Sequence, residues 1–143
     1  MNFKNSLRLQ LKKSYIKKAA FELHQATERF FACTLLTLTN YLPKTHNIEK
    51  LKKFCADQDL AFADIFPMDD KFHRRSFRRL QRAYIDARYS MHYEITEEEL
   101  AYLGSEVEKL EGLVEKQCVW HGFISEEPYA AVPVVTTKWL VSE

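Results

Sequence analysis

Four residues near the middle of the chain carry side chains that bind phosphate, transfer protons and stack on bases. They lie at the end of the run Arg82–Tyr93, as Arg88, Tyr89, His92 and Tyr93. Arginine supplies a permanently charged fork of donors for phosphate, histidine exchanges a proton near neutral pH, and tyrosine stacks on a base or donates its hydroxyl. This run predicts an anion or nucleotide pocket. A helix end whose polar side chains satisfy backbone carbonyls and pair with nearby acids explains it equally well.

The low glycine content excludes several familiar sites. The 143 residues hold three glycines, at 104, 112 and 122, so neither a P-loop, a dinucleotide fingerprint nor a nucleophile elbow can form. The five histidines and three cysteines lack the spacings of a zinc or other metal site, and we expect neither metal nor cofactor. Asp57 and Asp59 form the D-x-D of a nucleotidyltransferase without the Gly-Ser loop that precedes it, which favours a helix cap or a solvated loop.

Hydrophobic spacing predicts helices as the elements that position these residues. Apolar side chains recur three and four residues apart over Leu11–Leu42, with no glycine or proline inside, so this segment should form a central helix buried on more than one side. Pro43 ends it, and Thr45 is expected to cap a second helix over about 46–56. The inward face of the second helix should hold Ile48, Leu51 and Phe54.

Two more helices are expected in the second half of the chain. After Pro67, either Asp69 or Asp70 should cap a basic helix. Its inner face is predicted to hold Phe77, Leu80, Tyr84, Ala87 and Met91. The last helix should begin at Thr96, which forms a T-x-x-E capping box with Glu99. Its seven-residue seam, suited to one partner helix, is Leu100, Leu103, Val107, Leu110 and Val114. With so few turn residues an all-β fold is excluded, and we expect an all-α domain.

Charge is unevenly distributed behind a net charge of +1. Residues 1–18 carry six basic groups and no acid, residues 71–82 carry six more with none, and residues 94–115 hold eight glutamates against one lysine. Solvated helix faces whose charges offset each other are the favoured explanation. The alternative is that the basic segments attract an anionic partner such as nucleic acid or a nucleotide.

The cysteines and the composition of the two terminal segments indicate the compartment and the domain boundary. Cys33, Cys55 and Cys118 are far apart and odd in number, which indicates free thiols in a reducing compartment, two of them filling the core. We see neither a signal peptide nor a membrane span, so we expect a cytoplasmic protein with no membrane partner. Residues 119–143 are rich in Val, Thr and aromatics, which predicts an extended tail with one candidate short strand near 134–140. We therefore divide the chain into a helical domain, 1–118, and a tail, 119–143.

Two pairs of segments resemble HEPN domains. Ala19–Phe31 followed by Tyr41–Asn47 is similar to the Q-x-x-E helix and the P-x-T-H turn of that family. Ala83–Tyr89 and Tyr93–Leu100 look like later helices in the HEPN half of bacterial proteins that fuse a nucleotidyltransferase domain to a HEPN domain. The resemblance covers about residues 15–118. It implies an antiparallel up-and-down bundle of four to five helices, usually dimeric and associated with nucleotide or RNA binding.

The resemblance also implies a site. Its binding residues would be Glu28, Arg82, Arg88, Tyr89, His92 and Tyr93. Many relatives are ribonuclease toxins that use an Arg and a His with four to six residues between them, contributed by both subunits to a shared cleft. Arg88 and His92 are the only candidates here, to stabilise the phosphorane and act as general acid or base, but three residues separate them. Glu28 is expected either to hold the fork of Arg88 or to join a polar network without a ligand.

Three hypotheses follow from these observations. The first is a HEPN-like nucleotide- or RNA-binding domain that is expected to form a homodimer, acts with a fused or separately encoded nucleotidyltransferase and is not catalytic by itself. The second is a metal-independent ribonuclease toxin of a toxin–antitoxin pair, for which the short Arg88–His92 spacing is unfavourable. The third is a protein-interaction or dimerisation module without a ligand, using the acidic last helix or the tail.

Overall fold

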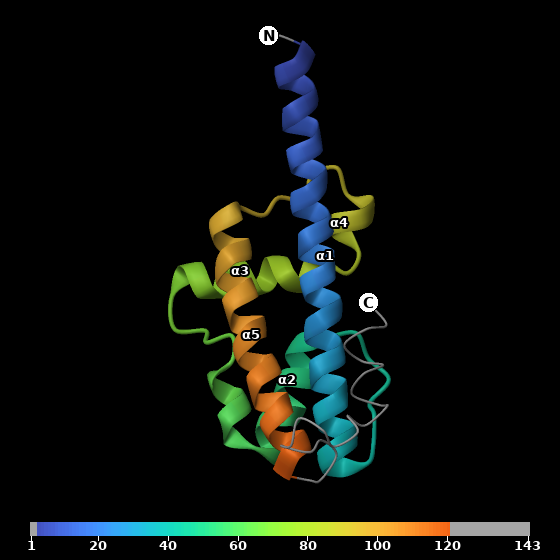
Figure 1. Cartoon of the computed structure of the whole chain (residues 1–143), viewed down its shortest axis with the longest axis vertical. Coiled ribbons are helices and arrows are strands. Elements are labelled where there is room, and N and C mark those ends of the chain that lie inside the picture. Colours follow the sequence, from blue (N-terminus) through green and yellow to red (C-terminus); the bar gives the residue numbers. More distant parts are fainter. Residues whose placement is uncertain (1–2, 121–143) are drawn as a thin grey trace, which may run out of the picture.

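A computed structural model describes residues 3–120, which form a bundle of helices (Figure 1). The elements in chain order are α1 (Phe3–Thr39), α2 (Ile48–Gln58), the short 3-10 helix η1 (Leu60–Asp64), α3 (Lys71–Arg82), α4 (Asp86–Tyr89) and α5 (Glu97–Trp120). The predicted all-α bundle of four to five helices is confirmed. No helix in this described part of the chain is long and apolar enough to cross a membrane. Helix α5 continues through the first two residues of the expected tail, and the rest of that tail, with its predicted strand, lies outside the described residues.

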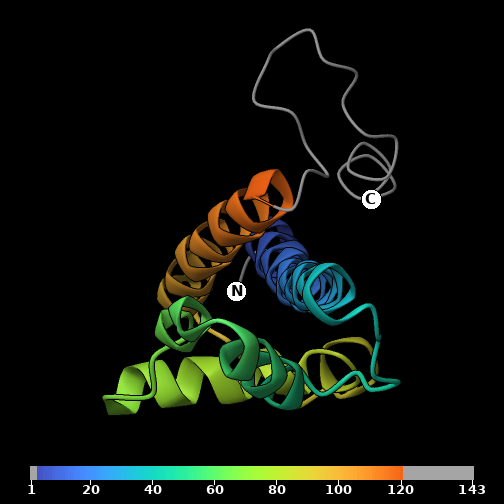
Figure 2. The same cartoon turned by 90° about the horizontal axis from the view of Figure 1, so that it is seen from below.

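The two long helices, α1 and α5, pack side by side and run in the same direction. Lys12 pairs with Glu97 at the start of α5, at 2.8 Å, and Cys33 contacts Cys118 near the end of α5. Helix α3 lies across both of them, as the two views show (Figures 1 and 2). This pair therefore departs from the expected antiparallel order, because the chain passes through four shorter elements before α5 begins beside α1.

Helix α1 is buried only over its second half. Its first fully buried residue is Ala20, and the first turns extend beyond the other helices (Figure 1). From there its buried residues follow the helical period that the sequence predicted; they are His24, Thr27, Phe31, Ala32, Thr34 and Leu35. The helix ends at Thr39, before the predicted Leu42, because Asn40 adopts a left-handed conformation with φ 58°, which asparagine tolerates.

Helix α2 starts at a different cap from the one predicted. The side chain of Asn47 accepts hydrogen bonds from the amides of Glu49 and Lys50, at 3.0 and 3.1 Å, so Asn47 is the N-cap. Thr45 instead accepts from the amide of Asn47 itself, which braces the turn before the cap. The predicted Ile48 and Leu51 are buried, but Phe54 is 40% exposed because Cys55 occupies the inward position beside it.

The caps predicted for α3 and α5 are present. Asp70 Oδ1 accepts from the amide of His73 at 2.7 Å, which makes Asp70 the cap of α3. Thr96 and Glu99 form the reciprocal capping box: the amide of Glu99 donates to the Thr96 hydroxyl, and the amide of Thr96 donates to the Glu99 carboxylate. The predicted seam of α5 is buried at Leu103, Val107, Leu110 and Val114.

Aromatic side chains from three parts of the chain meet in the core. Phe31 on α1, Phe62 on η1, Phe66 after η1 and Phe77 on α3 are each at most 1% exposed. Burying a side chain of this size contributes about 2–3 kcal/mol. These four phenylalanines fix α3 beneath the α1–α5 pair, and so fix where α3 delivers the chain to the candidate site.

Candidate functional site

The segment that should carry the site folds differently from its prediction. Helix α3 ends at Arg82 instead of continuing toward Met91; residues 83–85 form a turn, and α4 is a four-residue helix. The reason lies beyond α4: Tyr93 is 7% exposed, and its hydroxyl donates to the carbonyl of Arg79 at 2.7 Å. The chain must therefore fold back against the last turn of α3. Met91, predicted to face inward, is 90% exposed.

Arg88 on α4 is held in one orientation by its neighbours. Its Nε and Nη2 donate to the carbonyl of Tyr84, at 3.1 and 2.8 Å. The guanidinium carbon lies 4.6 Å from the centre of the Phe21 ring and 5.1 Å from that of Tyr89. A guanidinium has five N–H donors, so three remain for an anion. Stacking on aromatic rings reduces the entropy lost when those donors bind a ligand.

A basic groove lies between the first half of α1 and α4, with a volume of about 570 Å³. It is lined by Gln10, Lys13, Ser14, Lys17, Lys18 and Phe21 of α1, and by Ala87, Arg88, Tyr89, Ser90 and Met91. Lys17 ties the two walls together, since its Nζ donates to the carbonyl of Ser90 at 3.3 Å. Figure 1 shows α4 beside the middle of α1. The groove thus presents four cations, two aromatic rings and no carboxylate among its lining residues.

The sequence identified only part of this groove. Arg88 and Tyr89 were predicted as site residues and do line it. The lysines of α1 were recognised only as a basic segment, with no link to Arg88. The signal that could have found them is helical spacing: Lys13, Lys17 and Phe21 lie four residues apart and share one helix face.

The other predicted site residues lie outside the groove lining. Arg82 is exposed on the last turn of α3, and His92 is exposed in the turn after α4, where its amide donates to the Ser90 hydroxyl at 3.2 Å. We find no contact between His92 and Arg88 in the described residues. Burial raises the pKa of the Tyr93 hydroxyl above its ordinary value, and its bond to α3 gives it a structural position.

Glu28 does not pair with Arg88. Its Oε1 lies 2.6 Å from Nδ1 of His46, and its Oε2 lies 3.7 Å from Nδ1 of His24, which is 1% exposed. Burial above all, and then the charges of His46 and Arg88, lower the pKa of His24 to about 4. His24 is therefore uncharged at neutral pH and forms no ion pair with Glu28.

Glu28 is linked to Arg88 only indirectly, through His46 and Tyr84. The Tyr84 ring stacks on His46, with ring centres 4.6 Å apart and an angle of 16°, and lies 5.3 Å from the His24 ring. The same tyrosine accepts both Arg88 hydrogen bonds through its carbonyl. These three residues therefore form a chain of contacts that ends at Arg88, and none of them lines the groove. Of the two roles expected for Glu28, these contacts show the polar network and not the pairing with Arg88.

Comparison with protein families identifies the chain. The HEPN domain family matches residues 2–117. The chain belongs to the HEPN domain family. This family is known for nucleotide- and RNA-related functions, and HEPN domains often bind RNA or dimerise. A search of curated proteins finds no match to this chain. The matched residues of the HEPN domain include every residue that lines the basic groove.

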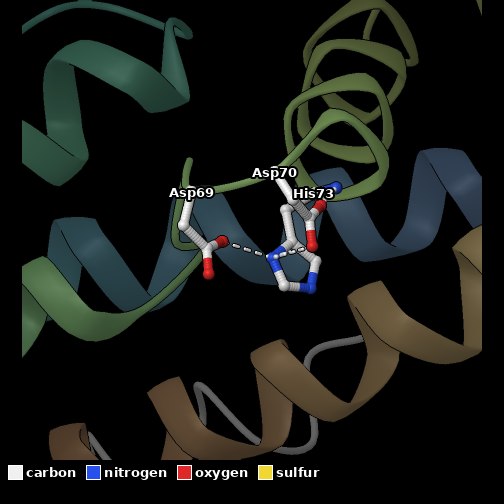
Figure 3. Close-up of side chains that lie close together, drawn as sticks. All are labelled: Asp69, Asp70 and His73. Atoms are coloured by element: carbon white, nitrogen blue, oxygen red, sulfur yellow. Dashed lines mark hydrogen bonds and ion pairs between the residues drawn. The ribbon is translucent and has the colours of Figure 1, made fainter.

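A second polar cluster of this HEPN domain lies at the start of α3. Asp69, Asp70 and His73 place one ligand atom each within 4.8 Å of one another (Figure 3). Nδ1 of His73 lies 2.6 Å from Asp69 Oδ1, and this hydrogen bond raises the pKa of His73. The His73 ring also stacks on Tyr102 at 4.5 Å. Helix capping by Asp70 and the Asp69–His73 pair account for these contacts, so we assign no metal to the cluster.

Proposed function

We propose that this HEPN domain binds the phosphates of a nucleotide or of single-stranded RNA in the groove between α1 and α4. The observation that carries the proposal is that Arg88 and three lysines of α1 line one groove together with Phe21 and Tyr89. Cations attract the phosphates and release their counterions, while aromatic faces stack on bases of any sequence. Because no glycine lines the groove, side chains must hold the phosphate.

The predicted participants have unequal roles in this proposal. Arg88 donates its free N–H groups to a phosphate oxygen, and the exposed ring of Tyr89 offers a stacking face at the rim. Arg82 and His92 lie outside the lining and could contact only the continuation of a longer RNA. Cleavage is not part of the proposal, because His92 makes no contact with Arg88 in the described chain.

The proposal extends to partners of the domain. We propose that it forms a homodimer and works with a nucleotidyltransferase domain, fused or separately encoded. This part rests on the similarity of Ala83–Tyr89 and Tyr93–Leu100 to HEPN halves of such proteins. Its tests are the mass of the protein in solution by light scattering, and capture of a nucleotidyltransferase encoded next to this chain. A monomer at all concentrations, or no association with that neighbour, contradicts it.

Equilibrium titration tests the binding proposal. Fluorescent adenosine triphosphate and a short single-stranded RNA are titrated with the protein at about 50 mM and about 200 mM salt. Saturable binding that weakens at the higher salt is expected. Arg88→Ala should weaken it about tenfold, which corresponds to roughly 1.4 kcal/mol.

The matched control is Arg78→Ala, an arginine exposed on α3 and absent from the groove lining. It should leave the affinity for adenosine triphosphate unchanged. Circular dichroism of both variants checks that the fold is intact. Absence of saturable binding at low salt, or equal affinities of Arg88→Ala and the unaltered protein, contradicts the proposed site.

A further inference from the structure

Two of the three cysteines meet where α1 and α5 pack together, far along α1 from the basic groove. Lys12 pairs with Glu97, and the thiols of Cys33 and Cys118 interact within one core cluster. The same number of residues separates Lys12 from Cys33 on α1 and Glu97 from Cys118 on α5. Parallel packing in constant register therefore accounts for the contact between the two thiols.

The surroundings of this thiol pair distinguish it from the third cysteine. Cys33 is half-buried and Cys118 is 6% exposed, and Thr37, one helical turn after Cys33, lies close enough to lower the pKa of both thiols. Cys55 is fully buried, and its thiol donates to the carbonyl of Phe31 at 3.5 Å. Burial raises the pKa of Cys55 to about 12, so it stays a protonated core residue.

We propose that Cys33 and Cys118 form an oxidisable thiol pair, which a peroxide converts to a disulfide that joins α1 to α5. Neither thiol has a role in the proposed phosphate site, so this inference is independent of the proposed function. An S–S bond of about 2.05 Å then joins the two sulfurs.

The chemistry requires one thiolate and one resolving thiol. The hydrogen bond from Cys33 lowers the pKa of Cys118 to about 7, against the opposing effects of burial and of the Glu115 charge. The same contact, together with burial, raises the pKa of Cys33. Cys118 is thus the nucleophile and Cys33 the resolving thiol.

The reaction proceeds in two balanced steps. The Cys118 thiol first ionises, and its thiolate attacks one peroxide oxygen. The O–O bond breaks, and the released hydroxide takes up the proton that the thiol lost, which leaves a sulfenic acid and one water. The Cys33 sulfur then attacks the Cys118 sulfur, the S–O bond breaks, and the Cys33 proton leaves with the hydroxyl as water. In total, two thiols and one hydrogen peroxide give one disulfide and two waters.

Peptide mapping of the full chain tests the pair. Reduced protein, freed of reductant, is treated with hydrogen peroxide, blocked with N-ethylmaleimide, digested and analysed by mass spectrometry. We expect a dithiothreitol-reversible link between the Cys33 and Cys118 peptides, with Cys55 alkylated only after denaturation. Three free thiols after treatment, a link that includes Cys55, or Cys118 oxidised to sulfinic acid without a link overturns the proposal.

Two further measurements test whether the two thiols form a reactive pair in the folded protein. The thermal midpoint of the oxidised protein should rise by more than about 5 °C, because the new bond closes a long loop; an unchanged or lower midpoint counts against the pair.

The rate of iodoacetamide reaction at Cys118 should titrate near pH 7, and Cys33→Ala should move that titration to higher pH. Cys55→Ala is the matched control and should keep the link. A Cys118 titration unchanged by Cys33→Ala refutes the contact.

Discussion

The salt dependence of RNA binding depends directly on how many groove cations contact phosphates. The perturbation is Lys13→Ala, which removes one cation from the groove wall formed by α1. Lys13 is exposed and makes no hydrogen bond or ion pair that positions another described residue, so its removal should leave the fold unchanged. Lys17 is less suitable, because it also bonds the carbonyl of Ser90.

The expected change in the salt dependence follows from the number of cations that line the groove. For single-stranded nucleic acid, the slope of log K against log salt concentration is about −0.7 for each phosphate neutralised. If Lys13, Lys17, Lys18 and Arg88 each neutralise one phosphate, the slope is about −2.8, and Lys13→Ala reduces it to about −2.1.

The assay is fluorescence anisotropy with a labelled short single-stranded RNA over a salt series, repeated for each variant. Lys53→Ala is the matched control, since Lys53 is exposed on α2 and outside the groove lining. Its slope should equal that of the unaltered protein. A slope unchanged by Lys13→Ala, or changed equally by Lys53→Ala, refutes the assignment of phosphate binding to this groove.

Three stability predictions follow from the supports of the site, each checked by urea unfolding followed by circular dichroism. Glu99→Ala should cost about 3 kcal/mol, because Glu99 is fully buried and accepts from Arg75 and Arg79; a loss below roughly 0.5 kcal/mol would show that the network contributes little. Burial raises the pKa of Glu99, but the hydrogen bonds from Thr96, Arg75 and Arg79 together lower it below its ordinary value. The stability that Glu99 contributes is therefore present above its unfolded-state pKa and is lost as pH falls. His24 has a pKa near 4 when folded and about 6.5 when unfolded, so the protein should lose about 2 kcal/mol from pH 7 to pH 5, a loss that His24→Gln removes; an unchanged pH dependence in that variant contradicts the burial argument. Asn47→Ala should cost about 1 kcal/mol, more than Thr45→Ala, since Asn47 is the cap of α2, and equal losses would contradict that assignment.

Local signals predicted the elements of this fold well. The Thr96–Glu99 capping box and the Asp70 cap depend on residues three positions apart, and both are present. The spacing of the α5 seam likewise identified its buried face. The end of α3 was missed because it depends on the hydrogen bond from Tyr93 to Arg79, which no local spacing indicates.

The site was predictable only in part, for the same reason. Arg88 and Tyr89 were identified from residue type, but their neighbours in the groove come from α1, far away in the sequence. One of the two roles expected for Glu28 was to hold the fork of Arg88, but Glu28 contacts His46 instead. Only tertiary packing brings these residues together. Residue type therefore identified Arg88 and Tyr89 as candidates for binding phosphate, but sequence spacing could not identify the residues of α1 that lie beside them.

The most direct test of the central claim is to locate the ligand by NMR. Adenosine triphosphate is titrated into isotope-labelled protein, and amide shifts are followed along the chain. We expect saturable shifts confined to two segments, 10–21 of α1 and 87–91 around α4, and Arg88→Ala should move their midpoint to about tenfold higher nucleotide concentration. Shifts centred on another surface, such as the start of α3, or no shifts at saturating nucleotide, would contradict it.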